Sequence, residues 1–140
     1  MYAPTRNEAR EFFFSAWEKY GAGHPLSALE RMAVEIIALH PEYHALLAAR
    51  DRHLERDFTP EHGALNPFLH LSLHLGIAEQ AAADRPAGIR AEIERLTRKH
   101  DDAHAALHDA VECLGEAMWQ AQRTGTPPDT ETFLDCLRRK

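Results

Sequence analysis

The chain contains 140 residues with a formal net charge of −6, and 44% of the residues are hydrophobic and 27% charged. This length suffices for one domain with its own hydrophobic core, and the composition is typical of a soluble globular protein. The acidic balance, with basic residues placed singly among acidic ones, argues against nucleic acid as a partner. We expect one domain over residues 1–140.

All predicted elements are α-helices, because alanine, leucine, glutamate and arginine dominate and alternating β patterns are absent. The first helix carries an aromatic stripe made of Phe13, Phe14, Trp17 and Tyr20. From the N-terminus, the expected helices cover residues 7–20, 26–39, 41–54, 66–83, 86–123 and 130–139. The expected fold is an all-α, single-domain helical bundle of about six helices.

Prolines and short polar residues set the predicted helix boundaries. Asn66 followed by Pro67 is typical of an N-cap and a first helical residue. Pro86, within "DRPAG", suits the start of the next helix. At Asp101–Asp102 the sequence leaves open whether that helix continues, kinks or restarts.

We expect neither a signal peptide nor a membrane span in this sequence. The apolar run at residues 12–14 is short and is followed by Ser15 and Glu18, and no stretch approaches the roughly 20 apolar residues that a span requires. Cys113 and Cys136 lie in helical patterns without close spacing, and we expect them to be reduced, buried thiols. The expected location is cytoplasmic.

Histidine is the unusual residue type, with 10 in the chain. In "NPFLHLSLHLGIAE", Ser72 and Glu79 mark the polar side of a helix, whereas His70 and His74 project toward the opposite, apolar side. Burying an imidazole without a partner costs about 1–3 kcal/mol. The two inward histidines therefore require partners, and a divalent metal bound at this four-residue spacing is one of them.

A second histidine pair lies in "HDDAHAALHDAVE". His104 and His108 lie at the border of the apolar face of their helix, and Glu112 lies further toward the polar side. If this helix neighbours the first, both pairs converge on one ion, with Glu112 as an oxygen ligand. Such a ligand set suits zinc or iron. The predicted metal ligands are His70, His74, His104, His108 and Glu112, with His40 and His44 next in rank.

The blocks "HPEYH", "NPFLHLSLHLGIAEQ", "DRPAGIR" and "HDAVECLGEAMWQAQRTGTPPD" together resemble a bacterial domain-of-unknown-function family numbered eighteen forty-one. The resemblance covers nearly the whole chain. It implies a small bacterial cytoplasmic protein and no particular activity. The histidine-bearing blocks of that family are matched here by His40, His44, His70, His74, His104 and His108, with Glu112 following.

Two functions remain open at this point. The first is a cytoplasmic helical protein that binds a divalent metal. The second is a non-enzymatic interaction module, with a homodimer as one form, in which the histidines are hydrogen-bonded packing groups. No G-x-S-x-G, P-loop, Rossmann or H-E-x-x-H motif occurs, so the sequence assigns no enzymatic reaction.

Overall fold

The computed structural model describes residues 6–54 and 66–140, and these residues form helices and turns without β-strand, which confirms the all-α class. The chain divides into two compact units, Met1–Leu75 and Gly76–Lys140, and each is described by itself. The single domain over residues 1–140 stays a prediction. Within the described residues there are eight α-helices rather than about six, together with one short 3₁₀ helix.

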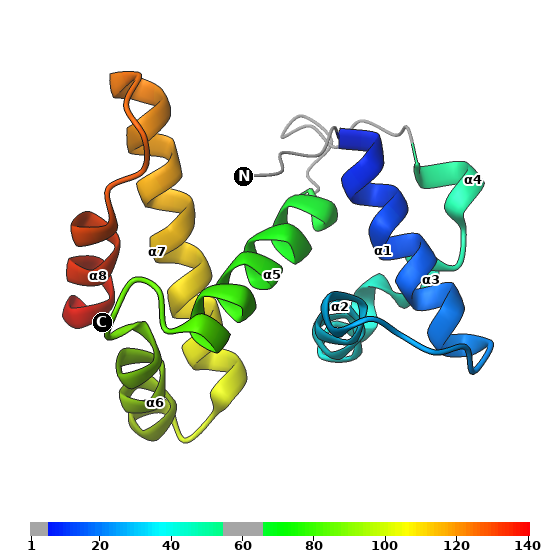
Figure 1. Cartoon of the computed structure of the whole chain (residues 1–140), viewed down its shortest axis with the longest axis horizontal. Coiled ribbons are helices and arrows are strands. Elements are labelled where there is room, and N and C mark those ends of the chain that lie inside the picture. The colour runs from blue at the N-terminus through cyan, green and yellow to red at the C-terminus, as the bar shows by residue number, and fades with distance from the viewer. Residues whose placement is uncertain (1–5, 55–65) are drawn as a thin grey trace. The chain divides into compact units, whose positions relative to one another are not determined.

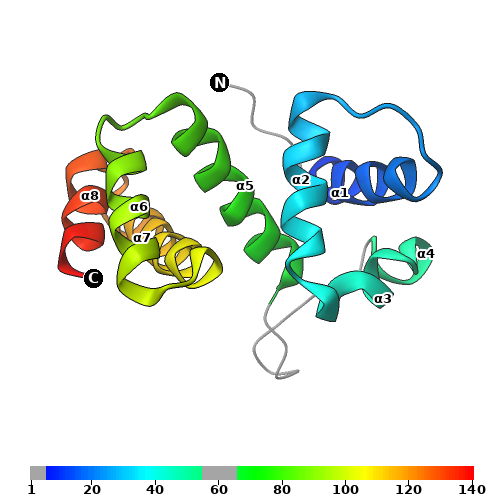
Figure 2. The ribbon, with the colours of Figure 1, turned by 90° about the horizontal axis from the view of Figure 1, so that it is seen from below.

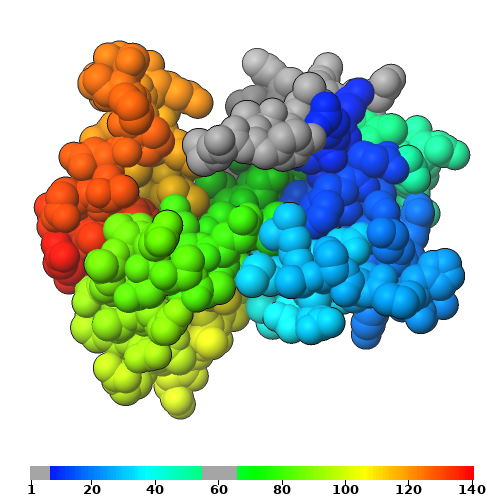
Figure 3. Space-filling model, in the orientation of Figure 1, coloured from blue at the N-terminus to red at the C-terminus, as the bar shows by residue number. Residues whose placement is uncertain are grey.

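The first unit contains α1 (Arg6–Gly21), α2 (Ala28–Ala38), η1 (Pro41–Tyr43), α3 (His44–Leu47), α4 (Arg50–His53) and the first half of α5 (Pro67–Ala83). Helices α1 and α2 pack against each other, and their side chains lie side by side in the space-filling view (Figure 3). Ser27 begins α2 with a capping box, in which Ser27 and Glu30 each accept a hydrogen bond from the other's backbone N–H. Phe14 of α1 contacts Phe68 of α5, with ring centroids 5.4 Å apart.

The helix predicted over residues 41–54 is divided into η1, α3 and α4, so that prediction is wrong in its continuity. The interruption follows from backbone angles that are not helical, φ −118° and ψ 56° at Ala49. A buried arginine of α1 holds the end of α4 in place. The Arg10 guanidinium donates to the carbonyls of His53 and Leu54, at 3.3 and 3.1 Å, and lies over the Phe68 ring.

The second unit contains the second half of α5, α6 (Ile89–His100), α7 (Ala103–Thr124) and α8 (Thr130–Arg139). Helix α7 packs against both α6 and α8 (Figures 1 and 2). The core of this unit consists of apolar side chains from all four helices, among them Ile77, Ile89, Leu96, Ala110, Phe133 and Leu137. No helix in the described part of the chain is long and apolar enough to cross a membrane.

Carboxylates set the helix boundaries in this unit. Helix α6 begins at Ile89 rather than at Pro86, because the Asp84 carboxylate accepts hydrogen bonds from the N–H groups of Gly88 and Arg90. The Asp101–Asp102 pair separates two helices. Asp101 ends α6 in the left-handed region at φ 51°, and Asp102 caps α7 by accepting from His104 N–H at 2.9 Å.

Cys113 of α7 and Cys136 of α8 form a disulfide, with their Cα atoms 5.7 Å apart. The expectation of two reduced thiols is therefore wrong. The pairing is non-local, because 23 residues separate the two cysteines and only the return of α8 along α7 brings them together. Disulfides persist mainly in oxidising compartments, so the predicted cytoplasmic location loses the support that reduced thiols gave it.

Candidate metal centre

Helix α5 places His70 and His74 one turn apart on the same face. The helix begins as predicted, because Asn66 Oδ1 accepts hydrogen bonds from the N–H groups of Phe68 and Leu69, at 3.0 and 3.2 Å. His74 is buried, with only 2% of its surface exposed, and His70 is half-buried beside it. The prediction that His74 points inward is confirmed.

His40 follows the C-terminal end of α2 and directly precedes Pro41. The proline disfavours helical geometry at His40, whose backbone angles are φ −126° and ψ 67°. The imidazole turns back onto α2 and becomes buried, with 1% exposed, and its Nδ1 lies 2.7 Å from the Ile36 carbonyl oxygen. Since a carbonyl oxygen only accepts, Nδ1 carries the proton, and the lone pair of the neutral ring lies on Nε2.

The three imidazoles of His40, His70 and His74 meet through their Nε2 atoms, within the first unit. His70 Nε2 lies 3.1 Å from His40 Nε2 and 3.2 Å from His74 Nε2. The ring centroids of the three residues are 4.7 to 5.0 Å apart, and the rings meet edge to face. We call these three residues the histidine triad.

A single two-centre hydrogen bond accounts for only one of the two short Nε2–Nε2 contacts of the triad. Because His40 Nε2 bears a lone pair, a hydrogen bond between the two rings must be donated by His70 Nε2. The single N–H of His70 then faces two nitrogens, Nε2 of His40 and Nε2 of His74. Both contacts are also compatible with a shared metal ion. A metal about 2.0–2.1 Å from each nitrogen separates two ligand nitrogens by about 3.0 Å at a right angle and about 3.4 Å at the tetrahedral angle. The observed 3.1 and 3.2 Å lie within that range.

The neighbours of the triad orient it. The Nδ1–H bond from His40 to a backbone carbonyl is the arrangement that fixes the tautomer of metal-binding histidines. The Tyr43 ring stacks on His40 with centroids 5.5 Å apart and planes 5° from parallel. Burial, followed by the charge of Glu42, raises the pKa of Tyr43 above its ordinary value of 10.0, so its phenol stays neutral at physiological pH.

His44 has a different environment, although the sequence ranked it with His40. Its Nε2 lies 2.9 Å from the Ile37 carbonyl oxygen, so this nitrogen donates and is occupied. Its ring packs on Trp17 with centroids 4.7 Å apart. His44 therefore fixes α3 against α1 and α2. By its sequence, His40 ranks below the predicted α7 ligands. The signal that distinguishes it is Pro41, which turns the preceding imidazole back onto α2.

The other predicted ligands lie on α7 in the second unit. The ring centroids of His104 and His108 are 4.2 Å apart, and His104 is half-buried whereas His108 is exposed. Glu112 is exposed, and its carboxylate lies 2.9 Å from Lys140 Nζ. Convergence of His104 and His108 with the α5 histidines, and ligation by Glu112, stay predictions.

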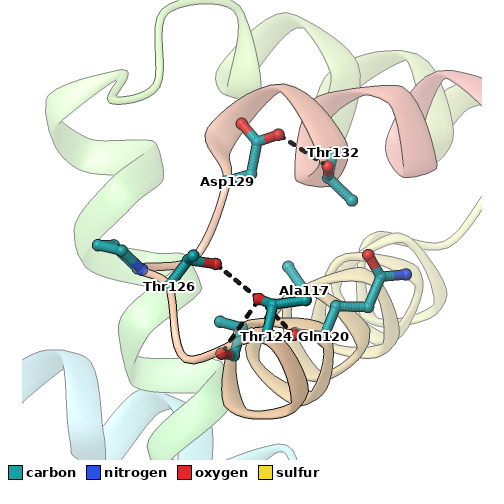
Figure 4. A pocket seen from close by; sticks show the side chains of 8 residues that line it. Ala117, Gln120, Thr124, Thr126, Asp129 and Thr132 are labelled. Atoms are coloured by element: carbon teal, nitrogen blue, oxygen red, sulfur yellow. Dashed lines mark hydrogen bonds between the residues drawn. The ribbon is translucent and has the colours of Figure 1, made fainter.

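A surface pocket of about 190 Å³ lies between α7 and the start of α8 (Figure 4). Its polar groups are occupied by local structure: the hydroxyls of Thr124 and Thr126 lie 2.6 Å apart, and Asp129 accepts from Thr132 Oγ1 and from Glu131 N–H. These bonds cap α8 and close the turn before it. The pocket therefore shows no convergent reactive groups, whereas the histidine triad does.

Comparisons with known proteins show the family and no activity. No curated protein and no solved structure matches the chain significantly. The sequence profile of the family described as "Domain of unknown function (DUF1841)" matches residues 5–139. That match covers nearly the whole chain, and the protein therefore belongs to this family.

Proposed function

We propose that this protein binds one divalent transition-metal ion through the imidazoles of His40, His70 and His74. The observation that carries the proposal is the pair of Nε2–Nε2 distances centred on His70, 3.1 and 3.2 Å. Those separations suit ligands of a common ion, and the lone pair of His40 faces the shared point. Burial of His40 and His74 supports a pre-formed site.

The imidazole nitrogens of the triad suit zinc or iron, the metals expected from the sequence. Imidazole nitrogen is a borderline ligand that suits zinc, iron, copper and nickel, whereas magnesium and calcium prefer oxygen. Three protein ligands leave a coordination position open for water, which is the arrangement of catalytic rather than structural zinc sites. A metal held in this way would polarise a bound oxygen or activate water. His104, His108 and Glu112 remain predicted ligands, and the proposal does not depend on them.

A second function is favoured by a separate observation. The ring nitrogens of His40 and His44 bond to the carbonyls of Ile36 and Ile37 at the end of α2. These two imidazoles satisfy backbone carbonyls at the end of α2, as expected if the histidines are packing groups of an interaction module that binds no metal. The two functions differ in one measurable property, which is the metal content of the purified protein.

The test is elemental analysis of the full chain, purified without an affinity tag or chelator. We expect close to one zinc or iron ion per chain, and its loss in the double variant His70→Ala/His74→Ala. The variant His24→Ala, at an exposed loop position, is the matched control and keeps the metal. His104→Ala/His108→Ala tests the predicted α7 ligands separately. A metal-free protein whose melting temperature is unchanged by added zinc, iron or manganese would contradict the proposal.

A further inference from the structure

Helix α7 carries a stripe of exposed side chains away from its packed face, and of these only Glu112 forms an ion pair with another part of the second unit, through Lys140. Glu112, Glu116, Trp119 and Arg123 recur at spacings of four, three and four residues, which places them within about 60° of one another around the helix. All four are exposed, and the buried residues of α7 lie on a different face, at Ala106, Ala110, Cys113 and Ala117.

Trp119 is the most unusual member of this stripe. Its side chain is 56% exposed, and the Arg123 guanidinium lies 4.6 Å from its ring centre. Tryptophan and arginine are the residue types most enriched at the energetically important centres of protein interfaces. An indole that is more than half exposed and lies against an arginine is suited to being covered by a partner.

The opposite charges of Glu116 and Arg123, which flank Trp119, complement those of a second copy of α7. Glu116 and Arg123 are seven residues apart, about 10.5 Å along the helix, so they cannot pair within one chain. In residues 6–54 and 66–140, neither forms an ion pair with another side chain. An antiparallel second copy of α7 brings Glu116 of each chain opposite Arg123 of the other, whereas a parallel copy opposes like charges.

We propose that two copies of this chain associate through α7, antiparallel about a two-fold axis near Trp119. The axis lies midway between Glu116 and Arg123, so the Glu116–Arg123 ion pair forms twice, once on each side of the axis, and the two indoles lie beside each other. A two-fold interface of this kind uses the same patch on both chains. Three helical turns bury less area than a standard stable interface, so the dimer is weak and depends on protein concentration.

Charge reversal tests the proposal on the full chain, by sedimentation equilibrium over a concentration series. We expect Glu116→Arg and Arg123→Glu each to raise the dissociation constant about tenfold or more, because each opposes like charges twice. An equimolar mixture of the two variants restores association, since each carries the charges that the other lacks. The double variant Glu116→Arg/Arg123→Glu also dimerises like the wild type.

Matched reversals on α6, Glu94→Arg and Arg98→Glu, control for net charge and leave the dimer unchanged, and circular dichroism verifies that each variant is folded. Recovery in the mixture supports the antiparallel pairing, because an effect on the fold of either variant would not be repaired by mixing. The proposal would be overturned if the wild type were monomeric at all concentrations. It would also be overturned if the α7 reversals raised the dissociation constant no more than the α6 controls, or if the mixture of the two α7 variants stayed monomeric.

Discussion

The Nε2 atoms of His40 and His70 lie 3.1 Å apart, although 30 residues separate the two histidines in the chain. One imidazole comes from the end of α2 and the other from the first turns of α5. The hydrogen bond that His40 Nδ1 donates to the Ile36 carbonyl limits how this contact can form, because it leaves a lone pair on Nε2, the nitrogen that faces His70. The contact is then either a hydrogen bond donated by His70 or one edge of a metal coordination sphere.

Replacing His40 by asparagine distinguishes a hydrogen bond donated by His70 from shared metal coordination. The asparagine amide retains a donor near the position of Nδ1, for the Ile36 carbonyl, and removes the Nε2 lone pair. A metal at 100 times its dissociation constant stabilises the folded state by about 2.7 kcal/mol. We expect added zinc to raise the melting temperature of the wild type and to have little effect on His40→Asn.

The control for this variant is His44→Gln, in which the amide retains a donor near the position of Nε2 for the Ile37 carbonyl. This variant should keep the zinc-dependent rise in melting temperature. Equal responses to zinc in the two variants would show that His40 is not a ligand.

The protonated nitrogen differs between His40 and His44, and this difference is directly observable. In the metal-free protein at a pH where both rings are neutral, we expect His40 to carry its proton on Nδ1 and His44 on Nε2, because these atoms face carbonyl oxygens. Long-range ¹⁵N–¹H correlation spectra distinguish the two tautomers by their chemical shifts. Finding the opposite tautomer at His40 would remove the lone pair from the triad and, with it, the structural basis of the metal proposal.

Local sequence patterns predicted most of the fold, because helix propensity, apolar periodicity and capping residues act over a few positions. The start of α5 at Asn66 and the inward position of His74 follow from such patterns. The division of residues 41–54 does not, because Arg10 of α1 reaches the end of α4 from more than 40 positions away in the sequence. The Cys113–Cys136 disulfide was likewise not predictable from local patterns, because it joins residues 23 positions apart in the sequence.

The candidate site was predictable in part. The four-residue spacing of His70 and His74 on an apolar face gave two members of the triad. The third member, His40, depends on how a proline turns one ring and on which helix packs beside it. Neither is visible in the periodicity of α2, and only the three-dimensional fold distinguishes His40 from His44.

Glu30 should make the stability of the first unit depend on acidic pH. The Lys19 ammonium, 2.7 Å away, and the Ser27 N–H lower the pKa of Glu30 from its ordinary value of 4.5. A carboxyl with a lowered folded-state pKa stabilises the fold above its unfolded-state pKa, and this contribution is lost as the pH falls through the folded-state value. We expect the wild type to exceed Glu30→Gln in stability at neutral pH and the difference to shrink below pH 4.5.

Urea unfolding from neutral pH to about pH 3 measures this difference in stability directly. Glu35→Gln, at an exposed position of the same helix, controls for the loss of a negative charge. A gap between Glu30→Gln and the wild type that stays constant across the acidic range would contradict the assignment of the effect to Glu30 ionisation.

The disulfide should contribute to the stability of the second unit, because it ties α8 to α7 through Cys113 and Cys136. A cross-link between cysteines 23 residues apart restricts the unfolded chain, and chain-entropy estimates for a loop of that size give about 3 kcal/mol. We therefore expect Cys113→Ser/Cys136→Ser to unfold at lower urea concentration than the wild type.

Reduction of the wild type separates the effect of the bond from that of the serine side chains, because the thiols keep the size and burial of the original residues. The reduced wild type should lose stability to a similar extent as the double variant. Thiol titration of the denatured, unreduced protein should find no reactive groups, and two groups should appear after reduction. Two thiols without reductant would show that the bond does not form, and α8 would then be held by its apolar face and the Arg95 bond to the Leu137 carbonyl.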